Sequence, residues 1–332
     1  MRPKTIPGKR IAIIGAGISG LSCAKQLLSL GYQVEVFEKS RGPSGRMSTR
    51  HGENWVADHG AQYFTARDSL FIKEVDSWIH NEVAVIWEPV IQVYEAGQWR
   101  LSQSSEIRYV GRPGMSSPGK FLAQNIDIHY NQTIDTIENI NSQWHLSSKE
   151  SGKLEKSFDW LVLALPAPQA QKLGMRIHLD IEKMTNQAHM KGCWTVMLRF
   201  PERPSVKFDA AFINQEIISW IARNHSKPER NGIESWTIHA NPQWSEAHIE
   251  LSKEEATALI LDCAKQIGFD CQRAEISTHK WRYASGAIAP APGFAIYPTQ
   301  NIAMCGDWLN GGRVEGAWLS GYQLANAISH LE

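Results

Sequence analysis

The first forty residues alternate between apolar and polar positions in a way that predicts a strand, a helix and a second strand. Ile11–Ile14 is an apolar run with the length of a buried strand. Apolar residues then recur at helical spacing up to Gly31, a residue typical of a helix end: Leu21, Ala24, Leu27 and Leu28. Val34–Phe37 follows as a second strand and leads into Glu38. This order predicts a β-α-β unit at the start of an α/β domain.

The hydrophobic pattern changes in the middle of the chain. Residues 126–137 predict a strand, a turn and a strand, and residues 144–163 a hairpin followed by a core strand that ends before Pro166. Between Pro168 and Tyr283, four stretches are typical of antiparallel strands: 194–200, 211–213, 217–222 and 235–240. A helical pattern covers 254–267. Residues 301–305 form a last apolar strand, followed by a helix rich in small residues.

The turn between the first strand and the first helix carries the pattern Gly-x-Gly-x-x-Gly. Gly15 allows a tight turn, Gly17 allows the backbone to approach a pyrophosphate, and Gly20 lets the helix lie close to the sheet. The helix N-terminus then faces the phosphates with unpaired N–H groups. We expect a dinucleotide to bind here, at Gly15, Ala16, Gly17, Ile18, Ser19 and Gly20. The alternative is a chance glycine turn.

An acidic residue and a basic, glycine-containing loop follow the second strand. Glu38 lies eighteen positions after Gly20, where a carboxylate accepts hydrogen bonds from ribose hydroxyls. The loop at 39–50 suits a pyrophosphate, because guanidinium groups form charge-assisted hydrogen bonds with phosphate. The alternative is that its arginines face solvent. The loop supplies five candidate contacts: Lys39, Arg41, Gly45, Arg46 and Met47. Together these features resemble the FAD-binding flavoproteins of the amine-oxidase superfamily.

The C-terminal segment carries the same resemblance. Gly306-Asp307 follows the last strand, and Gly316-Ala317 opens the last helix after Arg313. In the flavoproteins that this segment resembles, the aspartate binds the ribityl–phosphate part of FAD, and the helix N-terminus points at the N1–C2=O edge of the flavin. The resemblance also implies that Ile134 contacts the adenine and that Gln62 lies at the cofactor. We therefore expect non-covalently bound FAD, held by Gly306, Asp307, Arg313, Gly316 and Ala317 among others.

The predicted fold is thus α/β, with a Rossmann-like FAD-binding domain of the amine-oxidase type interrupted by a mainly antiparallel substrate domain. We expect residues 1–70, 112–168 and 285–332 to form the FAD-binding domain. Residues 71–111 and 169–284 are expected to form the substrate domain, with the reaction at the interface.

Four motifs resemble the renalases, especially their bacterial relatives, over nearly the whole chain. They are Gly45-Arg46-Met47-Ser48-Thr49, Asp58-His-Gly60-Ala61-Gln62-Tyr63-Phe64, His279-Lys280-Trp281-Arg282-Tyr283 and Gly306-Asp307. Pro43-Ser44-Gly45 departs from the two adjacent glycines usual in amine oxidases. The resemblance implies oxidation of the 2- and 6-dihydro isomers of NAD(P)H to NAD(P)+, with O2 reduced to hydrogen peroxide.

The resemblance nominates five residues for the substrate site: Trp281, His239, Asn224, Tyr63 and Trp220. Trp281 would form an aromatic wall, while Asn224 and His239 would hydrogen-bond the carboxamide or the ribose. Each residue also suits an ordinary packing role, since a tryptophan on a strand is usually part of the core. Strand alternation beside Trp281 should turn Lys280 away from the flavin.

Two other functions fit the same scaffold: an amine oxidase or desaturase, and a flavin-binding module without turnover. A second Gly-x-Gly-x-x-Gly is absent from the sequence. A dinucleotide substrate would therefore bind mainly through its nicotinamide end, and its 2′-phosphate should matter little.

The amino-acid composition limits the classes of partner that the chain is expected to bind. The 332 residues contain 34 Lys and Arg against 34 Asp and Glu, with no basic cluster, which argues against nucleic acid and anionic membranes. We see neither a signal peptide nor a membrane anchor, and expect a cytoplasmic enzyme acting on small molecules. The five cysteines form no Cys-x-x-Cys, which indicates reduced thiols. No metal site is expected, and the oligomeric state is left open.

Overall fold

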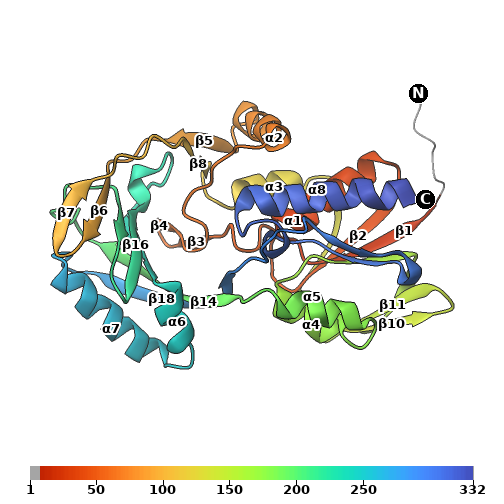
Figure 1. Cartoon of the computed structure of the whole chain (residues 1–332). Coiled ribbons are helices and arrows are strands. Elements are labelled where there is room, and N and C mark those ends of the chain that lie inside the picture. Colours follow the sequence, from red (N-terminus) through yellow and green to blue (C-terminus); the bar gives the residue numbers. More distant parts are fainter. Residues whose placement is uncertain (1–7, 332) are drawn as a thin grey trace.

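The computed structural model describes residues 8–331, and these form two lobes that lie side by side (Figure 1). The first lobe contains a six-stranded sheet in the order β19-β20-β13-β1-β2-β9. All neighbours are parallel except β19, which is antiparallel to β20. The strands are β1 (Arg10–Ile14), β2 (Gln33–Glu38), β9 (Asp127–Tyr130), β13 (Trp160–Leu163), β19 (Ala295–Tyr297) and β20 (Ile302–Met304).

Both faces of this sheet are covered. Successive side chains point to opposite faces, so Ile11 and Ile13 belong to one buried cluster and Ala12 and Ile14 to another. Three helices cover the first face: α1 (Ile18–Ser29), α3 (Ser117–Leu122) and α8 (Val314–Leu331). Helix α2 (Ser69–His80) packs in turn on α8, where Phe71 meets Trp318. The second face is covered by β10 (Ile134–Ile140), β11 (Gln143–Ser148), β12 (Gly152–Phe158), α4 (Ala167–Gly174) and α5 (Leu179–Asn186). Parallel sheets need this double cover because both of their faces are apolar.

Helices α1 and α8 bring the two ends of the chain into close contact. A Cβ atom at Gly321 would lie 2.0 Å from the carbonyl oxygen of Ser19, so only glycine permits this approach. Ser22 Oγ donates to the carbonyl of Trp318 at 2.8 Å across the same contact. The small residues of the last helix therefore serve helix packing as well as any ligand.

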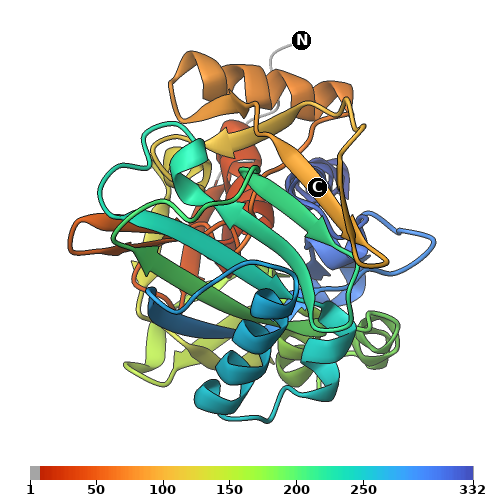
Figure 2. The same cartoon turned by 90° about the vertical axis from the view of Figure 1, so that its left-hand side faces the viewer.

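The second lobe is built on a seven-stranded sheet in the order β18-β14-β17-β16-β15-β6-β7. Its strands are β6 (Ile91–Glu95), β7 (Gln98–Leu101), β14 (Lys191–Phe200), β15 (Ala210–Ile213), β16 (Ile218–Arg223), β17 (Glu234–Ala240) and β18 (Glu275–Ser285). All pairings are antiparallel except β6–β15. Helices α6 (Pro242–Ala247) and α7 (Lys253–Gln266) lie on its outer face, in front of the sheet in Figure 2.

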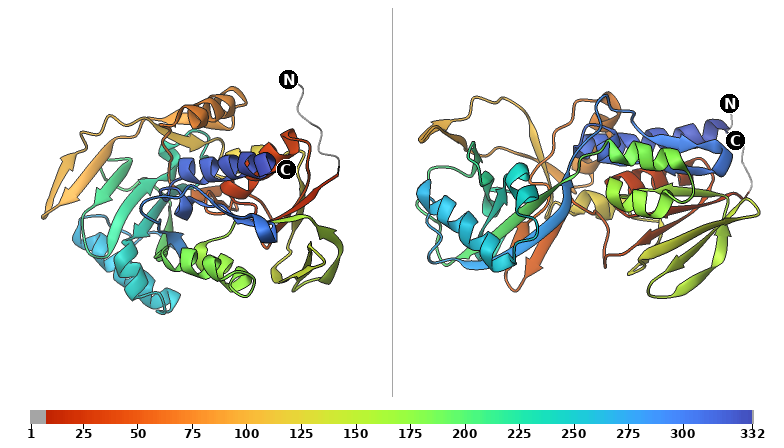
Figure 3. Two further views of the ribbon diagram at one scale, coloured as in Figure 1. Left: turned by 45° about the vertical axis from the view of Figure 1, so that its right-hand side comes forward. Right: turned by 60° about the horizontal axis from the view of Figure 1, so that its bottom comes forward.

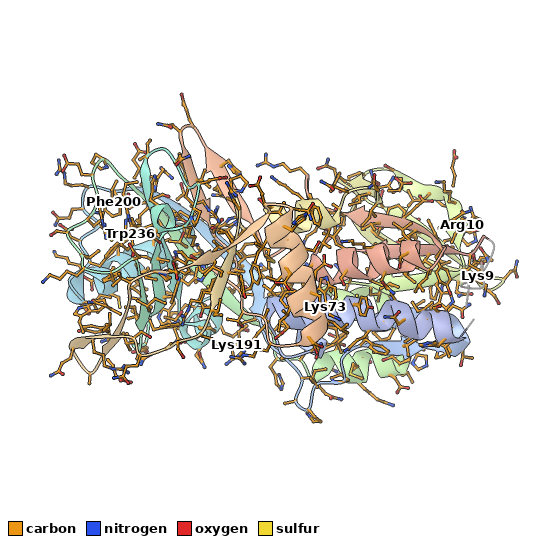
Figure 4. All side chains as sticks on the ribbon, turned by 90° about the horizontal axis from the view of Figure 1, so that it is seen from above. Lys9, Arg10, Lys73, Lys191, Phe200 and Trp236 are labelled. Carbon is orange, nitrogen blue, oxygen red and sulfur yellow. The ribbon has the colours of Figure 1, made fainter. Side chains whose placement is uncertain are left out.

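Strand β14 connects the lobes. Lys191 at its start lies at the junction, and Phe200 at its end lies far into the second lobe (Figure 4). Two small antiparallel pairs also lie between the sheets, as the ribbon of Figure 3 shows. They are formed by β3 (Thr49–Gly52) with β4 (Trp55–Asp58), and by β5 (Ala84–Trp87) with β8 (Arg108–Gly111).

The predicted fold class is confirmed, and the four antiparallel stretches and the helix at 254–267 match β14 to β17 and α7. The domain boundaries fall differently. Helices α4 and α5 pack with the first lobe, because Ala170 and Ile181 share a buried cluster with Ile14 and Leu163. Helix α2 also packs with the first lobe. The chain therefore leaves the first lobe near Met190 rather than after Pro168, and residues 1–7 and 332 of the expected FAD-binding domain lie outside the described residues.

In the part of the chain that the structure describes, no helix has both the length and the apolar character needed to cross a bilayer.

Candidate active site

The three glycines of the first turn differ in what surrounds them. Gly15 has a φ of +107°, and a Cβ there would lie 2.4 Å from the carbonyl oxygen of Ala164. A Cβ at Gly20 would lie 2.0 Å from the carbonyl oxygen of Gly15. Gly17 differs, because nothing lies within 4 Å of a Cβ built there. The space above Gly17 therefore suits a ligand rather than packing.

The N-terminus of α1 is left open for an anion. Its N-cap residue is Gly17, which offers no side-chain hydrogen bond, and the first turn, including the buried Ile18 and Ser19, holds no acidic residue. The positive end of the helix dipole therefore faces the open space over Gly17 without an acidic side chain in the first turn. This fits a phosphate group of FAD.

Glu38 is buried at the end of β2 and braces the glycine loop. Its carboxylate accepts from Ala16 N and from Ser40 N, both at 2.8 Å. Each oxygen keeps one lone pair, enough to accept from a ribose hydroxyl. Gln132 N donates to the carbonyl of Glu38 at 2.9 Å, which brings the start of β10 close by. Ile134 itself lies in the second buried cluster of the first lobe.

The loop at 39–48 folds back over the glycine turn. Ser44 N donates to the carbonyl of Ala16 at 2.9 Å, and Gly45 lies against Gly17. Met47 is buried, whereas Lys39 and Arg41 are exposed. The loop thus lies beside the open space over Gly17, as a pyrophosphate-binding loop must.

An ion pair joins this loop to the C-terminal segment. The guanidinium of Arg46 pairs with the buried carboxylate of Asp307, with Nη1 and Oδ2 3.0 Å apart. Arg46 Nη1 also donates to the carbonyl of Ala284 at 3.0 Å, at the end of β18. A charge-assisted pair of this kind fixes two polar groups that phosphate and ribityl oxygens can bind.

The entry into α8 is a tight turn around Asp307. Gly312 N donates to the carbonyl of Asp307 at 2.7 Å, and Gly306 N donates to Ser320 Oγ at 3.0 Å. A Cβ at Gly316 would lie 1.7 Å from the carbonyl oxygen of Asn310, so Gly316 is needed for the turn itself. Arg313 is exposed and Ala317 is half-buried.

The sheet of the second lobe presents a row of side chains toward the first lobe. Strand register places five residues side by side on this inner face: His279, Thr195, His239, Trp220 and Phe212. Their neighbours in sequence, such as Trp194 and Ile238, point to the outer face and pack on α7. The inner face is therefore a wall that carries the polar and aromatic side chains of this sheet that point toward the first lobe.

His59 lies against the inner face. Trp281 Nε1 donates to the carbonyl of His59 at 2.9 Å, and His239 Nε2 lies 3.3 Å from the same oxygen. The ring of His59 stacks on Trp281 at 5.3 Å and meets His279 edge-on at 5.1 Å. The loop holding His59 is in turn bonded to the cofactor loop, because Ala61 N donates to the carbonyl of Arg46 at 2.9 Å.

Burial keeps the three imidazoles neutral. Desolvation lowers the pKa of His59 to about 3 and the pKa values of His239 and His279 to about 4. Nearby positive charge adds to the effect, from Arg50 on His59 and His279 and from Lys227 on His239. At physiological pH these three side chains are aromatic, polar and uncharged.

Tyr63 and Trp220 continue the wall. Their ring centroids are 5.6 Å apart, and Trp220 also packs on Phe212 at 4.7 Å. Tyr63 is half-buried under the guanidinium of Arg108, whose Cζ lies 5.3 Å from the ring centroid. Both residues therefore join Trp281 and His239 at the inner face.

Asn224 has a different place from the one expected. Its side chain is fully buried, its Oδ1 accepts from Asp58 N at 2.9 Å, and its Nδ2 donates to Thr237 Oγ1 at 3.1 Å. Because both ends of the amide are engaged inside the protein, the expected hydrogen bond to a substrate is replaced by a structural one. Asn224 holds the strand before His59 in place.

Gln62 belongs to the same buried network. Its Nε2 donates to the carbonyl of Asp58 at 2.6 Å, and its Oε1 accepts from Lys227 Nζ at 3.3 Å. Its polar atoms thus stabilise the loop rather than point at the cofactor. The centre of the network is Asp58, whose carboxylate pairs with Lys227 at 3.2 Å and Arg230 at 2.8 Å, all three side chains being fully buried.

Lys280 faces the outer side, as strand alternation predicts. Its Nζ donates to the carbonyl of Ile249 at 2.7 Å and lies 4.8 Å from the ring centroid of Trp194. Lys280 and Trp281 therefore point to opposite faces of β18.

Sequence reasoning missed His59, His279 and the charged network. Asp58 and His59 stand inside a motif that the sequence singles out, so the motif was the available signal. Lys227 and Arg230 lie in a turn after β16 and have no periodic pattern to mark them. Only the fold brings them to Asp58, some 170 residues away in the chain.

Comparison with known proteins settles the family. The model of the flavin containing amine oxidoreductases matches residues 90–329, most of the chain. The chain belongs to this flavin-containing amine oxidoreductase family. An NAD(P)-binding Rossmann-like domain model matches residues 13–74, which include the glycine turn. Membership in the amine oxidoreductase family implies an oxidoreductase with a flavin cofactor.

Individual relatives of this chain match only in part. An L-amino-acid oxidase of Sistrurus catenatus edwardsii is 48% identical over 149 residues, which are 43% of this chain and 28% of that protein. A zeta-carotene-forming phytoene desaturase of Myxococcus xanthus is 42% identical over 53 residues, 16% of this chain and 10% of that protein. The chain therefore aligns with less than a third of the length of these relatives.

Solved structures agree in fold over almost the whole chain. A protein of an Exiguobacterium species has a TM-score of 0.80 at 12% identity and covers 98% of this chain and 99% of its own. Cyclohexylamine oxidase from Brevibacterium oxydans has a TM-score of 0.74 at 14% identity, with 98% and 99% covered. At such identities the likeness shows the fold alone.

Proposed function

We propose that this chain binds FAD non-covalently and oxidises the 2- and 6-dihydro isomers of NAD(P)H to NAD(P)+, with O2 reduced to H2O2. The observation that carries the proposal is the uncharged inner face beside the cofactor loop. Its indoles and neutral imidazoles suit a planar, uncharged dihydropyridine ring, which binds by stacking and needs few polar contacts.

The residues that would hold FAD fit the group. The open helix N-terminus at Gly17 would take the pyrophosphate, and Glu38 the adenosine ribose. Arg46 and Asp307 would contact the phosphate and the ribityl chain. A non-covalent cofactor is supported by the thiols. All five cysteines are buried, and burial raises the pKa of Cys193 to about 11, so this thiol on the inner face is a poor nucleophile.

When bound, FAD would supply a hydride acceptor at N5 and would pass the two electrons to O2, which becomes H2O2 with the proton carried by the hydride and one further proton from solvent. The dihydropyridine loses hydride from C2 or C6 and becomes an aromatic pyridinium, so the reaction needs no protein base. This chain's residues then contribute orientation. Trp281 is fixed by its hydrogen bond to His59 and presents an aromatic wall, while His239 and Tyr63 limit the positions of the ring. These groups also exclude water from the reacting carbon.

The inner face suits an ammonium substrate less well than an uncharged ring. A cation in a desolvated site needs a carboxylate or an aromatic cage, and the rings of this wall supply only the second of these. The acid next to this wall, Asp58, is already paired with two cations and fully buried. The family match keeps an amine oxidase or desaturase as the second candidate. A flavin-binding module without turnover is a third possibility, and one experiment separates them.

The test is anaerobic mixing of the flavin-loaded protein with each substrate class, followed at the flavin absorbance. Rapid bleaching by 2- or 6-dihydronicotinamide dinucleotides, and not by primary or secondary amines, supports the proposal. Bleaching by amines alone points to the second candidate, and bleaching by neither to the module. Ordinary 4-dihydro NADH is the matched control, because it has the same dinucleotide and the wrong hydride position.

A further inference from the structure

The hairpin of β3 and β4 carries one arginine on the side that faces the second lobe. The register pairs Gly52 with Trp55 and Arg50 with Ala57, and paired residues share a face of a hairpin. His59 continues this face beyond β4, because it follows Ala57 at a spacing of two. Arg50 therefore lies between Trp55 and His59 on a single face of the hairpin.

The two ends of this face contact the inner face of the second lobe. At the tip of the hairpin, Arg199 Cζ lies 4.6 Å from the ring centroid of Trp55, and Arg199 Nη1 donates to Ser277 Oγ at 2.8 Å. At the base, the ring of His59 stacks on Trp281 at 5.3 Å. The hairpin thus lies along β18 from Ser277 to Trp281.

These two contacts place Arg50 at the level of His279. His279 is the inner-face residue between Ser277 and Trp281 on β18, as Arg50 is between the tip and the base of the hairpin. The electrostatics agree with this placement. Desolvation is the main cause of the lowered pKa values of His59 and His279, and the positive charge of Arg50 lowers both further.

Arg50 has no counter-charge, whereas the arginines on either side of it do. Arg199, farther from the cofactor loop, pairs with Glu275 at 3.2 Å. Arg46, nearer to the flavin site, pairs with Asp307. Arg50 is half-buried, yet within residues 8–331 its guanidinium has neither a hydrogen-bond acceptor nor a carboxylate partner. Charges that are partly removed from water are usually paired, so this one suits an anion that arrives with a ligand.

The nearest acid along the hairpin does not supply that charge. Asp58 pairs in register with Thr49, on the face opposite to Arg50, and its Oδ1 accepts from Thr49 Oγ1 at 2.7 Å. Its carboxylate is already paired with two buried cations. The imidazoles beside Arg50 are neutral at physiological pH, because their pKa values are lowered to about 3 and about 4.

The position of Arg50 matches one part of the proposed substrate. His279 lies two residues from Trp281, about 7 Å along β18 in the direction away from the cofactor loop. A nicotinamide ring at Trp281 carries a ribose and then a phosphate, which is the anionic group closest to the ring. Arginine binds phosphate oxygens with two parallel N–H donors, and a half-buried side chain leaves these donors within reach of a ligand.

We infer that the guanidinium of Arg50 binds the phosphate joined to the nicotinamide ribose. The inference rests on the proposed function, since it names the second contact by which that site holds its substrate. It assigns the phosphate nearest to the ring and leaves the adenosine end, with any 2′-phosphate, outside the contact.

The test compares two probes on the flavin-loaded protein, nicotinamide mononucleotide and nicotinamide riboside, which differ in this phosphate. Dissociation constants come from calorimetry and from the change in the flavin spectrum. The wild type should bind the mononucleotide about tenfold more tightly than the riboside. Added NaCl should weaken the binding of the mononucleotide and leave that of the riboside nearly unchanged.

Arg50→Gln should abolish the preference for the mononucleotide and leave riboside binding unchanged, and Arg50→Lys should keep part of the preference. Arg282→Gln is the matched control, because Arg282 is an exposed arginine on the outer side of β18 that pairs with Glu250. This control should keep the full preference. A wild type without the preference, or an Arg50→Gln protein that retains both its flavin and the preference, would overturn the inference.

A carboxylate offers a guanidinium the same chemistry as a phosphate, and a second pair of probes separates the two. L-phenylalanine and 2-phenylethylamine differ in the carboxylate. A preference for the amino acid that is lost in Arg50→Gln, with no effect on mononucleotide binding, would assign Arg50 to a substrate carboxylate and contradict the inference.

The failure of the inference and that of the proposed function are distinguishable. If dihydronicotinamides bleach the wild-type flavin but the mononucleotide and the riboside bind equally, only the phosphate contact fails. If they do not bleach it, yet the preference exists and is lost in Arg50→Gln, the contact stands and the proposed reaction fails. With both correct, Arg50→Gln raises KM for the dihydro mononucleotide isomers about tenfold with little change in kcat.

Discussion

At the scale of single residues, the buried polar side chains of the site differ in whether their hydrogen-bonding groups all have partners. Asn224 has both ends of its amide bonded inside the protein, which makes it part of the scaffold. Trp220 and His59 are also buried, although slightly less deeply, and each keeps one polar atom unpaired. The same contrast holds for glycines: Gly15 and Gly20 are required by neighbouring backbone, whereas Gly17 faces open space.

The glycine contrast gives the first prediction. Gly17→Ala should fold as stably as the wild type, because its φ is −73° and no atom lies near the added Cβ, yet it should weaken FAD binding at least tenfold. Gly15→Ala should instead lose about 2 kcal/mol or more of unfolding free energy without cofactor, because φ is +107° and Ala164 is too close. Urea unfolding of the cofactor-free protein and FAD titration measure the two effects separately.

Trp281 gives the second prediction. Trp281→Ala should slow anaerobic flavin reduction about tenfold or more, since the aromatic wall is lost, while the FAD content stays unchanged. Trp281→Phe keeps a ring and loses only the hydrogen bond to His59. Its rate of flavin reduction should therefore lie between those of the wild type and Trp281→Ala. Loss of flavin from Trp281→Ala would show that the residue supports the cofactor instead.

At the scale of elements, strand alternation divides the second lobe into a packed outer face and an inner face whose row from His279 to Phe212 is uncharged. The inner face is tied to the first lobe by the turn after β4. Asp58 anchors that turn, because it accepts from Met115 N at 3.0 Å and from Thr49 at 2.7 Å in addition to its two cations. The pKa of Asp58 is consequently well below its usual range, although burial alone would raise it.

The charge balance of this network gives the third prediction. Asp58→Asn leaves two buried cations without a carboxylate and should cost about 3–5 kcal/mol of unfolding free energy. Lys227→Met keeps the pair of Asp58 and Arg230 and should be close to neutral or stabilising. Urea unfolding at pH 7 compares the two, and equal losses would contradict the assignment of Asp58 as the centre.

The pH dependence of the network is the fourth prediction. Burial lowers the pKa of Lys227 from 10.5 to about 8, so the unfolded chain binds more protons between these values. The free energy of unfolding should therefore rise from about pH 8 to pH 10.5, by up to about 3 kcal/mol from this group. Lys227→Met removes that contribution, and the difference between the two stability curves isolates it from other groups that titrate in the same range.

At the scale of the whole molecule, the cofactor site is made by both ends of the chain and the substrate wall by its middle. Arg46 and Asp307 meet across 261 positions, and His59 and Trp281 across 222. Among residues 8–331, one glycine turn of the Gly-x-Gly-x-x-Gly type is present, and the proposed FAD occupies it. A dinucleotide substrate would then be held mainly at its nicotinamide end.

This arrangement gives the fifth prediction. The 2- or 6-dihydro isomers of NADH and NADPH should be turned over with similar kcat/KM, because the 2′-phosphate would lie outside the inner face. Steady-state oxygen consumption with both forms measures it. A hundredfold preference for one form would show that the adenosine end has a pocket of its own.

Much of the cofactor site in the first lobe could be predicted from the sequence, because the constraints on its residues are local. Gly15, Gly17 and Gly20 mark a turn, and Glu38 follows a strand, so short-range pattern suffices. The small residues of α8 were harder, since Gly321 is explained by Ser19 on another helix. The boundary near residue 190 was missed because α4 and α5 have helical patterns that do not reveal which sheet they cover.

The sequence by itself determined the glycine turn, the acid after β2 and the alternation that turns Lys280 away from Trp281. These follow from backbone geometry and strand periodicity, which act over a few residues. Only the tertiary structure decided that Asn224 is enclosed by Asp58 and Thr237 and that His59 and Trp220 are left unpaired. The satisfaction of a polar group depends on partners from distant segments, and no local pattern records them.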